Sequence, residues 1–594
     1  MSTAILTGQP VPGSSIEDDL RSLGFDVRVA GDVADAETLL ARVPGDERVA
    51  VVDARFVGHL HALRLGLTDP RFPLAAISGA VTAQAAGRQA LTRAMARENS
   101  AGGGAAVAVD NLADRIVTAL DADGADVHRP ELGSLVAEVP ADPQARNEAR
   151  QAVTAVDDEA VRLKSAVKSR DGFFTTFFIS PYSRYIARWC ARRGLTPNQV
   201  TTASLLTALI AAGCAATGTR AGYVAAGILL ICSFVLDCTD GQLARYSLQY
   251  STLGAWLDAT FDRAKEYAYY AGLALGAARG GDDVWALALG AMVLQTCRHV
   301  VDFSFNEANH DATANTSPTA ALSGRLDSVG WTVWLRRMIV LPIGERWAMI
   351  AVLTAVTTPR ITFYVLLIGC AFAATYTTAG RVLRSLTRRA QRTDRAAQAL
   401  AHLADNGPLA EAVARVAPRI PAPVSAAAGG LLVVISAAVW GAGWPTVLGA
   451  VAYVLLSGVA VSRPLKGALD WLVPPFFRAA EYGTVLVLAA KSGVNGVLPA
   501  AFGLVAAVAY HHYDTVYRIR GNAGAPPAWL VRAIGGQEGR TLLVTVLAAL
   551  VTASQFKVAL TVLAVAVALV VLVESIRFWV SAGAPAVHDE GEPA

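Results

Sequence analysis

The chain has 594 residues, of which 54% are hydrophobic and 17% charged, and its mean hydropathy is +0.41. This composition excludes an ordinary soluble protein, and it excludes a disordered chain, which would show low hydrophobicity and high net charge. The formal net charge of +3 is too small to indicate a nucleic-acid partner. The six cysteines form no CxxC pair and are interpreted as reduced, so no disulfide scaffold is expected.

Residues 1–160 are predicted to form an α/β domain. Short apolar runs alternate there with helical patterns; the runs lie at 48–53 and 73–78, and the helical patterns at 15–23, 36–43 and 82–97. The amino terminus lacks a basic segment followed by an apolar stretch, so we expect no secretory signal and a cytoplasmic domain. A glycine-rich stretch at 101–105 is interpreted as a turn, and a charged helix is expected from about Asp142 to Lys168.

Twelve apolar segments follow, each close to the roughly 20 helical residues that cross a hydrocarbon core. They lie near 199–217, 221–239, 253–277, 283–304, 344–358, 361–381, 424–442, 445–461, 471–490, 494–512, 541–553 and 556–579. The expected fold is therefore an all-α polytopic membrane protein with two six-helix halves, 161–385 and 421–594, behind the soluble domain.

A basic linker at 386–420 separates the two halves. Its arginine-rich start indicates a cytoplasmic location by the positive-inside rule; the arginines are Arg384, Arg388, Arg389, Arg392 and Arg395. An even number of crossings in each half then places the amino terminus, the linker and the carboxy terminus on the cytoplasmic side of the plasma membrane.

Four carboxylates stand at the junction of the second and third apolar segments. Asp237 and Asp240 share about 140° of one helix face with Gly241, Ala244 and Arg245. Asp258 and Asp262 lie one turn apart on the next predicted helix. Four buried anions are costly unless cations neutralise them, and carboxylate oxygens suit Mg²⁺ or Mn²⁺. The sequence therefore predicts a two-metal site able to bind a diphosphate.

This spacing, D-x2-D-G-x2-A-R-x8-G-x3-D-x3-D, resembles the signature of the CDP-alcohol phosphotransferases, six-helix membrane enzymes, over roughly 165–385. The resemblance implies a transferase that moves a phosphoalcohol from a CDP-linked donor to a hydroxyl acceptor and releases CMP. It implies that Asp237, Asp240 and Asp258 hold the metals. Asp262 would also touch metal and would be the catalytic base. Gly241, Ala244 and Arg245 would line the CMP site.

The stretch Lys168–Phe174, with Ser180 and Arg184, is similar to the branch that makes di-inositol phosphate compounds from CDP-inositol. The donor implied is CDP-diacylglycerol or CDP-inositol, and the acceptor a polyol or polyol phosphate. Members of this branch often carry a cytidylyltransferase domain in front. Here the glycine-rich nucleotide loop is absent after the first predicted strand, so a related domain at 1–160 would be degenerate and inactive.

The second half is interpreted as a degenerate copy of the first. The segment 256–267 aligns without a gap with 471–482, including Arg263 and Glu266 with Arg478 and Glu481. Val473 and Phe477 replace Asp258 and Asp262, and the segment 237–245 has no counterpart. We therefore expect a catalytically dead half that takes the place of a second protomer, so that no homodimer is needed.

Two other functions remain open. Twelve crossings in two related halves with buried carboxylates also describe a secondary transporter. A non-catalytic regulator that binds cytidine nucleotide without turnover is the third possibility. The glycine, alanine and arginine between the aspartates favour the transferase, because a cation pathway does not require them. Arg298, His299 and Asp302 are interpreted as a structural polar cluster. Arg381 is interpreted as a positive-inside anchor, and the alternative is that it binds a phosphate of the donor or acceptor.

Overall fold

The computed structural model describes residues 2–101, 111–168, 171–312, 334, 338–387, 391–418 and 420–581. The chain divides into two compact units, each described below by itself. The first comprises 1–169, 182–197 and 239–251, and the second 170–181, 198–238 and 252–594. The glycine-rich stretch expected to be a turn, with Arg388 and Arg389 of the linker, lies outside the described residues.

The first unit contains a five-stranded sheet in the order β2-β1-β3-β6-β5. Its strands are β1 (Ser2–Thr7), β2 (Phe25–Ala30), β3 (Arg48–Asp53), β5 (Leu74–Ile77) and β6 (Ala80–Ala83), and a separate pair joins β4 (Val57–Gly58) to β7 (Ala137–Glu138). β1 runs parallel to β2 and β3, whereas β6 is antiparallel to both β3 and β5. The predicted α/β domain is confirmed.

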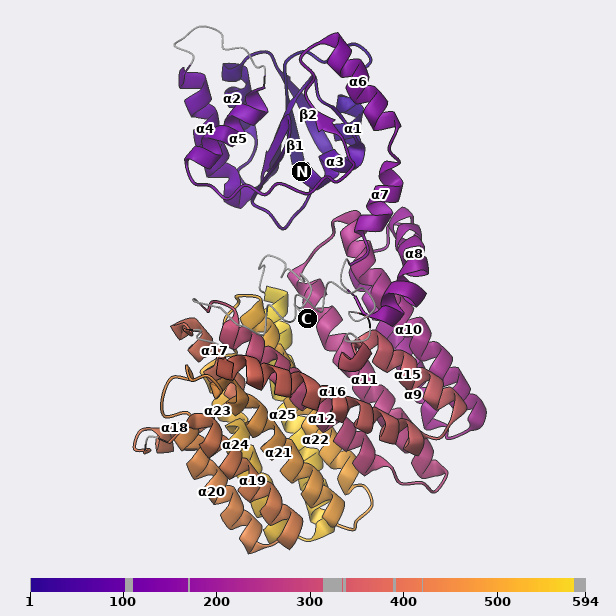
Figure 1. The fold of residues 1–594 in the computed structure, drawn as a ribbon, viewed down its shortest axis with the longest axis vertical. Coiled ribbons are helices and arrows are strands. Elements are labelled where there is room, and N and C mark those ends of the chain that lie inside the picture. The colour runs from indigo at the N-terminus through magenta and orange to yellow at the C-terminus, as the bar shows by residue number, and fades with distance from the viewer. Residues whose placement is uncertain are drawn as a thin grey trace. The chain divides into compact units, whose positions relative to one another are not determined.

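Helices cover both faces of this sheet because its central strands alternate two sets of buried apolar side chains. Figure 1 shows α2, α4 and α5 on one side and α1 and α3 on the other. The helices are α1 (Ile16–Ser22), α2 (Val33–Arg42), α3 (Leu60–Leu67), α4 (Arg88–Ala101), α5 (Leu112–Ala122), α6 (Pro143–Thr154), α7 (Asp158–Ser165) and α8 (Ser180–Arg192).

Two sequence-based boundaries in this unit are wrong. The helix expected over 82–97 begins only at Arg88, because Ser78 and Gly79, with φ +73° at the glycine, turn β5 into β6. The single helix expected from Asp142 to Lys168 is broken into α6 and α7. Asp157 starts α7 by accepting hydrogen bonds from the backbone N–H groups of Glu159 and Ala160, at 3.1 Å each.

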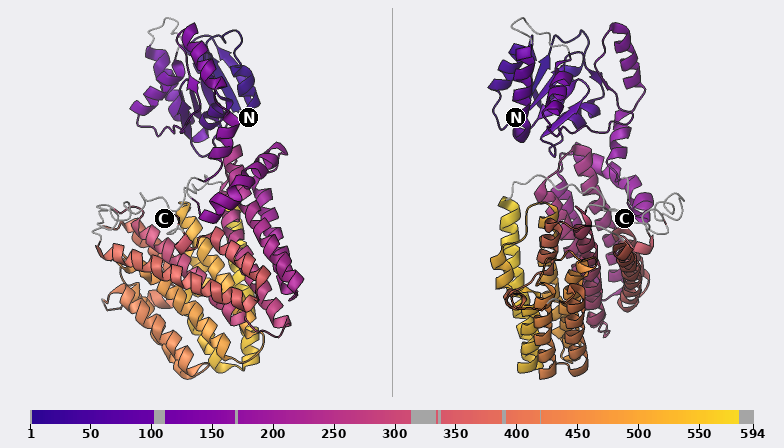
Figure 2. Two further views of the ribbon diagram at one scale, coloured as in Figure 1. Left: turned by 45° about the vertical axis from the view of Figure 1, so that its right-hand side comes forward. Right: turned by 60° about the vertical axis from the view of Figure 1, so that its left-hand side comes forward.

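Helices occupy all twelve of the predicted apolar segments. They are α9 (Pro197–Ala216), α10 (Arg220–Ser247), α11 (Thr252–Arg279), α12 (Trp285–Asn309), α15 (Ile343–Val356), α16 (Pro359–Thr387), α19 (Ala422–Trp440), α20 (Trp444–Ala460), α21 (Val473–Lys491), α22 (Val497–Arg520), α24 (Gly536–Leu550) and α25 (Ala553–Ser581). Among the described residues, five are long and apolar enough to cross a membrane, namely α9, α10, α16, α19 and α25. In Figures 1 and 2 the helices from α19 to α25 run side by side.

The segment expected to be a polar linker also folds. It forms α17 (Asp394–Ala404) and α18 (Pro408–Ala414), and a short helix α23 (Ala528–Ala533) stands later in the chain. Leu400 and Leu403 are fully buried and belong to the large apolar core of the second unit. Part of the predicted linker is therefore packed structure, because one face of α17 is apolar.

Candidate active site

The carboxy-terminal turns of α10 carry the first part of the acidic motif. Asp237 and Asp240 lie one turn apart on this helix. The helix ends where Leu248 adopts a left-handed conformation with φ +52°. The backbone N–H of Gln249 then donates to the carbonyl of Ala244 at 3.0 Å, which closes the helix end. This stop allows α11 to begin at Thr252, so the second pair of aspartates follows closely in the chain.

Three of the four predicted metal ligands converge. Asp237, Asp240 and Asp258 each offer a carboxylate oxygen, and these three atoms lie within 4.8 Å of one another. Asp240 is buried, and the other two are partly buried. A set of three carboxylate oxygens fits a hard divalent cation such as Mg²⁺ or Mn²⁺, and a cation would offset the cost of gathering three anions.

The fourth predicted ligand has a different partner. Lys265 lies on α11, three residues after Asp262, and its side chain is 0% exposed. Its ammonium lies 2.9 Å from Oδ1 of Asp262, donates to Oδ1 of Asp237, and donates to the Ser204 hydroxyl at 3.2 Å. Sequence reasoning missed Lys265, although a lysine within an apolar segment is itself a signal for a functional site.

The residues expected to line a cytidine site lie on the same helix as the first two aspartates. Nε of Arg245 donates to the carbonyl of Ala166 at 2.6 Å, which orients the guanidinium. The atoms nearest to a Cβ placed on Gly241 would be those of this guanidinium, at 3.5 Å, an ordinary contact distance. No neighbouring protein atom within 4 Å therefore requires the glycine, whereas a ligand lying against this face would.

The polar residues of α12 make protein contacts. Asp302 forms an ion pair with Arg381 of α16, and Arg298 donates to the carbonyl of Leu341 at 3.4 Å. A hydrogen bond of 2.5 Å joins Nδ1 of His299 to the hydroxyl of Tyr513, on α22. These contacts agree with the structural interpretation of this cluster.

Comparison with known proteins identifies two regions. Residues 194–375 match the CDP-alcohol phosphatidyltransferase family, and residues 394–594 match a family of unknown function, DUF5941. The "bifunctional IPC transferase and DIPP synthase" of Aquifex aeolicus is 32% identical over 114 residues, which are 19% of this chain and 26% of that protein.

Two further relatives are synthases. The "phosphatidylinositol phosphate synthase" of Streptomyces avermitilis is 35% identical over 131 residues, covering 21% of this chain and 51% of the relative. The "archaetidylinositol phosphate synthase" of Pyrococcus horikoshii is 32% identical over 113 residues, covering 19% and 58%. The chain thus spans between about a quarter and three fifths of the length of these relatives.

The matched region contains α9 to α12, α15 and most of α16, together with the converging carboxylates and the helix face of Gly241 and Arg245. The aspartate motif, the order of the helices and the similarity to named synthases all point to the same family. Residues 194–375 therefore form the part of the chain that is similar to the CDP-alcohol phosphatidyltransferase family.

Proposed function

We propose that this chain is a divalent-metal-dependent membrane transferase that moves a phosphoalcohol from a CDP-linked donor to a hydroxyl acceptor. The observation that carries the proposal is the convergence of Asp237, Asp240 and Asp258 within the region that matches the transferase family. A bound Mg²⁺ or Mn²⁺ would neutralise the donor diphosphate and stabilise the charge that develops on the leaving phosphate.

The residues then have distinct roles. Asp237, Asp240 and Asp258 would hold the cation, and Gly241, Ala244 and Arg245 would bind the cytidine end of the donor. The acceptor oxygen forms a bond to the phosphorus that carries the alcohol, and the bond from that phosphorus to CMP breaks. The acceptor proton passes to the carboxylate of Asp262, which acts as the general base.

The names of two relatives favour an inositol phosphate acceptor, because both are synthases of lipid-linked inositol phosphates. CDP-diacylglycerol and CDP-inositol are the two donors to compare. We expect the purified chain to release CMP from one of them only when the matching polyol acceptor and Mg²⁺ or Mn²⁺ are present. Product mass would identify the pair, and absence of metal-dependent CMP release with every combination would contradict the proposal.

We also propose that residues 421–594 are a duplicate of the transferase half. The first support is a cluster in the transferase half that we call the first clamp, formed by Glu266 between Arg263 and Arg346. Nη1 of Arg263 lies 2.9 Å from Oε2 of Glu266, and Nε of Arg346 lies 3.1 Å from Oε1. The glutamate and Arg346 are nearly fully buried.

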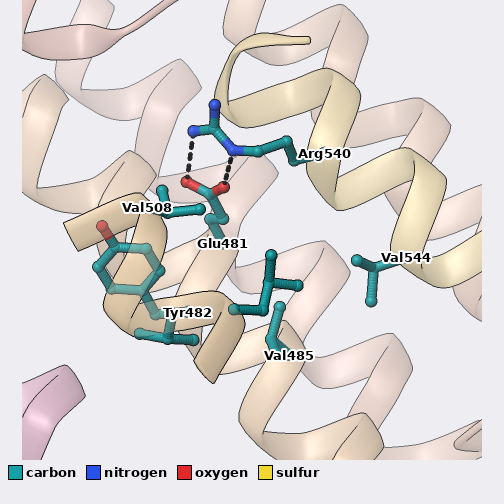
Figure 3. Close-up of a pocket in the computed structure, with 8 residues that line it drawn as sticks. Glu481, Tyr482, Val485, Val508, Arg540 and Val544 are labelled. Atoms are coloured by element: carbon teal, nitrogen blue, oxygen red, sulfur yellow. Dashed lines mark hydrogen bonds and ion pairs between the residues drawn. The ribbon is translucent and has the colours of Figure 1, made fainter. Parts of the chain in front are cut away.

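A second clamp repeats this geometry atom for atom. Nη1 of Arg478 lies 2.8 Å from Oε2 of Glu481, and Nε of Arg540 lies 2.6 Å from Oε1. Figure 3 shows Arg540 donating hydrogen bonds to both carboxylate oxygens of Glu481, beside Tyr482. The arginines of both clamps come from equivalent helices, α11 and α15 in one half and α21 and α24 in the other.

A glycine packed against a glutamate gives a second, independent correspondence, in which the second glycine, Gly407, lies at the start of α18, before residue 421. A Cβ on Gly172 would come within 2.5 Å of Oε2 of Glu345, and a Cβ on Gly407 within 2.8 Å of Oε1 of Glu538. Each glutamate accepts a hydrogen bond from a nearby backbone N–H, that of Phe174 at 3.3 Å or of Gly407 at 3.0 Å. A shared ancestry of the halves explains both features.

Helices of the two halves contact one another in reciprocal pairs, as they would in a dimer with two-fold symmetry. α12 packs against α21, its counterpart α22 packs against α11, and α12 and α22 pack against each other. In a symmetric dimer the same pairs of elements meet twice in this way. This pattern supports the proposal that the second half takes the place of a second protomer.

Truncation at about residue 400 tests the substitution. We expect the shortened chain to lose stability or to self-associate, because the faces of α11 and α12 that contact α22 would be exposed. Light scattering in detergent measures the oligomeric state. A truncated chain that remains monomeric, stable and fully active would contradict the proposal.

Cysteine labelling tests the proposed topology. Accessible cysteines at residue 400 and at the carboxy terminus should label from the cytoplasmic side, and one near Gly281 from outside. Labelling of residue 400 from outside would contradict two six-crossing halves.

A further inference from the structure

The buried ammonium of Lys265 occupies a place between two of the four motif aspartates. Building on the proposed function, we infer that the site takes a single divalent cation, held by Asp237, Asp240 and Asp258, and that Lys265 supplies the second positive charge, between Asp237 and Asp262. The motif alone predicts two metals. The structure points instead to one metal and one lysine.

Two hydrogen bonds, to Asp237 and Ser204, and an ion pair with Asp262 hold Lys265 at this place. An ammonium has three donors, and three oxygen partners surround this one: Oδ1 of Asp237, Oδ1 of Asp262 and Oγ of Ser204. The side chain is 0% exposed, and its ammonium lies 5.4 Å from the ring centroid of Trp347. A buried ammonium is costly unless anions compensate its charge, and here the compensating anions are two motif carboxylates.

This arrangement opposes a second divalent cation. A second metal beside Asp237 and Asp262 would stand next to the buried ammonium of Lys265, which lies 2.9 Å from Oδ1 of Asp262. Coulomb repulsion between a divalent cation and an ammonium is strong at such separations when water is excluded. A carboxylate has two oxygens, so Asp237 can pair with Lys265 through one and ligate the first metal through the other.

The second half provides an internal comparison. In the gapless alignment of the two halves, Ala480 stands where Lys265 stands, and Val473 and Phe477 stand where Asp258 and Asp262 stand. Ala480, Val473 and Phe477 are buried, as Lys265 is. The lysine is thus present in the half that has the carboxylates and absent from the half that lacks them, as expected if its charge compensates theirs.

Manganese binding to the full-length chain in detergent tests the inference without reference to turnover. Equilibrium dialysis counts the bound ions, and electron paramagnetic resonance distinguishes an isolated Mn²⁺ from a coupled pair. We expect one Mn²⁺ per chain with an uncoupled spectrum. Two ions per chain with a coupled spectrum would overturn the inference.

Three variants sharpen the test. Lys265→Ala, which introduces the residue of the second half, should raise the count to two, whereas Lys265→Arg keeps the charge and should leave it at one. Asp262→Asn should leave one Mn²⁺ bound with an affinity within about threefold of the parent, because Asp262 is not a ligand in the one-metal site. A count of one in Lys265→Ala, or a large loss of affinity in Asp262→Asn, would contradict the role of Lys265.

Failure of the inference differs from failure of the proposed function. Two bound ions together with CMP release would refute the single-metal site and leave the transferase intact. No bound ion and no CMP release would refute the transferase itself.

Discussion

The two regions that we propose to be duplicates, 161–385 and 421–594, each contain a buried clamp, but only the first contains the four motif aspartates. α10 has 28 residues and carries Asp237 and Asp240 near its end, whereas its counterpart α20 has 17 and ends before any equivalent acidic segment. Buried arginine–glutamate pairs persist in both halves because losing one partner leaves an uncompensated charge. If the second region is a duplicate, as proposed, it has kept residues that maintain packing and lost residues that only the proposed reaction needs.

The largest expected difference between the two halves is at Asp262, the proposed base. Asp262→Asn should lower transferase activity at least 100-fold, since removal of a general base typically costs about 10²- to 10⁴-fold. Expression and CDP-donor binding should remain largely intact. Initial rates of CMP release with saturating donor measure the effect, and Phe477→Leu, at the equivalent place in the second half, is the control. Activity within tenfold of the parent would remove Asp262 from the base assignment.

The clamps test whether the halves are stabilised in the same way. Arg346→Met and Arg540→Met should each lower the free energy of unfolding by about 3–5 kcal/mol, because each leaves a buried glutamate short of a partner. Arg540 also lies 2.6 Å from Asp405, so its loss should be the larger of the two. Denaturant unfolding in detergent measures both variants. A change below about 1 kcal/mol in either would mean that the two clamps are not equivalent.

Substitution of Gly407 or Gly172 should lower stability by less than loss of a clamp arginine. Gly407→Ala should destabilise the protein by about 1–3 kcal/mol, because the new Cβ would overlap the backbone carbonyl of Gly535, which cannot move aside. Gly172→Ala should cost less, since the atoms it meets are at the end of the flexible Glu345 side chain. The difference in melting temperature between the two variants is the measurement. The reverse order would contradict this interpretation of the two contacts.

The smallest effect concerns the interface between the halves. Tyr513→Phe removes the 2.5 Å hydrogen bond to His299 and should lower the free energy of unfolding by about 1 kcal/mol. Tyr510→Phe, which removes a 2.9 Å hydrogen bond to Ser575 within the second half, is the matched control. If only Tyr513→Phe increases self-association of the chain in detergent, the hydrogen bond contributes to the joining of the halves.

Much of the architecture is predictable from the sequence because its signals are local. Runs of apolar residues place twelve helices, and the strand at 48–53 follows from an apolar run between polar neighbours. The motif spacing by itself puts Asp237 and Asp240 on one face of α10. Such features depend on periodicity and helix geometry, which a chain carries in its own order of residues.

Other features require the tertiary structure, because they depend on residues far apart in the sequence. Arg346 and Arg540 complete the clamps from helices that lie outside the aligned segments of the two halves. The arginines before α17 led to the prediction of a linker, yet the leucines of this helix lie in the core. Above all, Lys265 meets Asp237 only when α10 and α11 pack together, and the motif cannot reveal this contact. Spacing along a helix predicts which carboxylates can converge, but only the packing of helices decides which cation each of them meets.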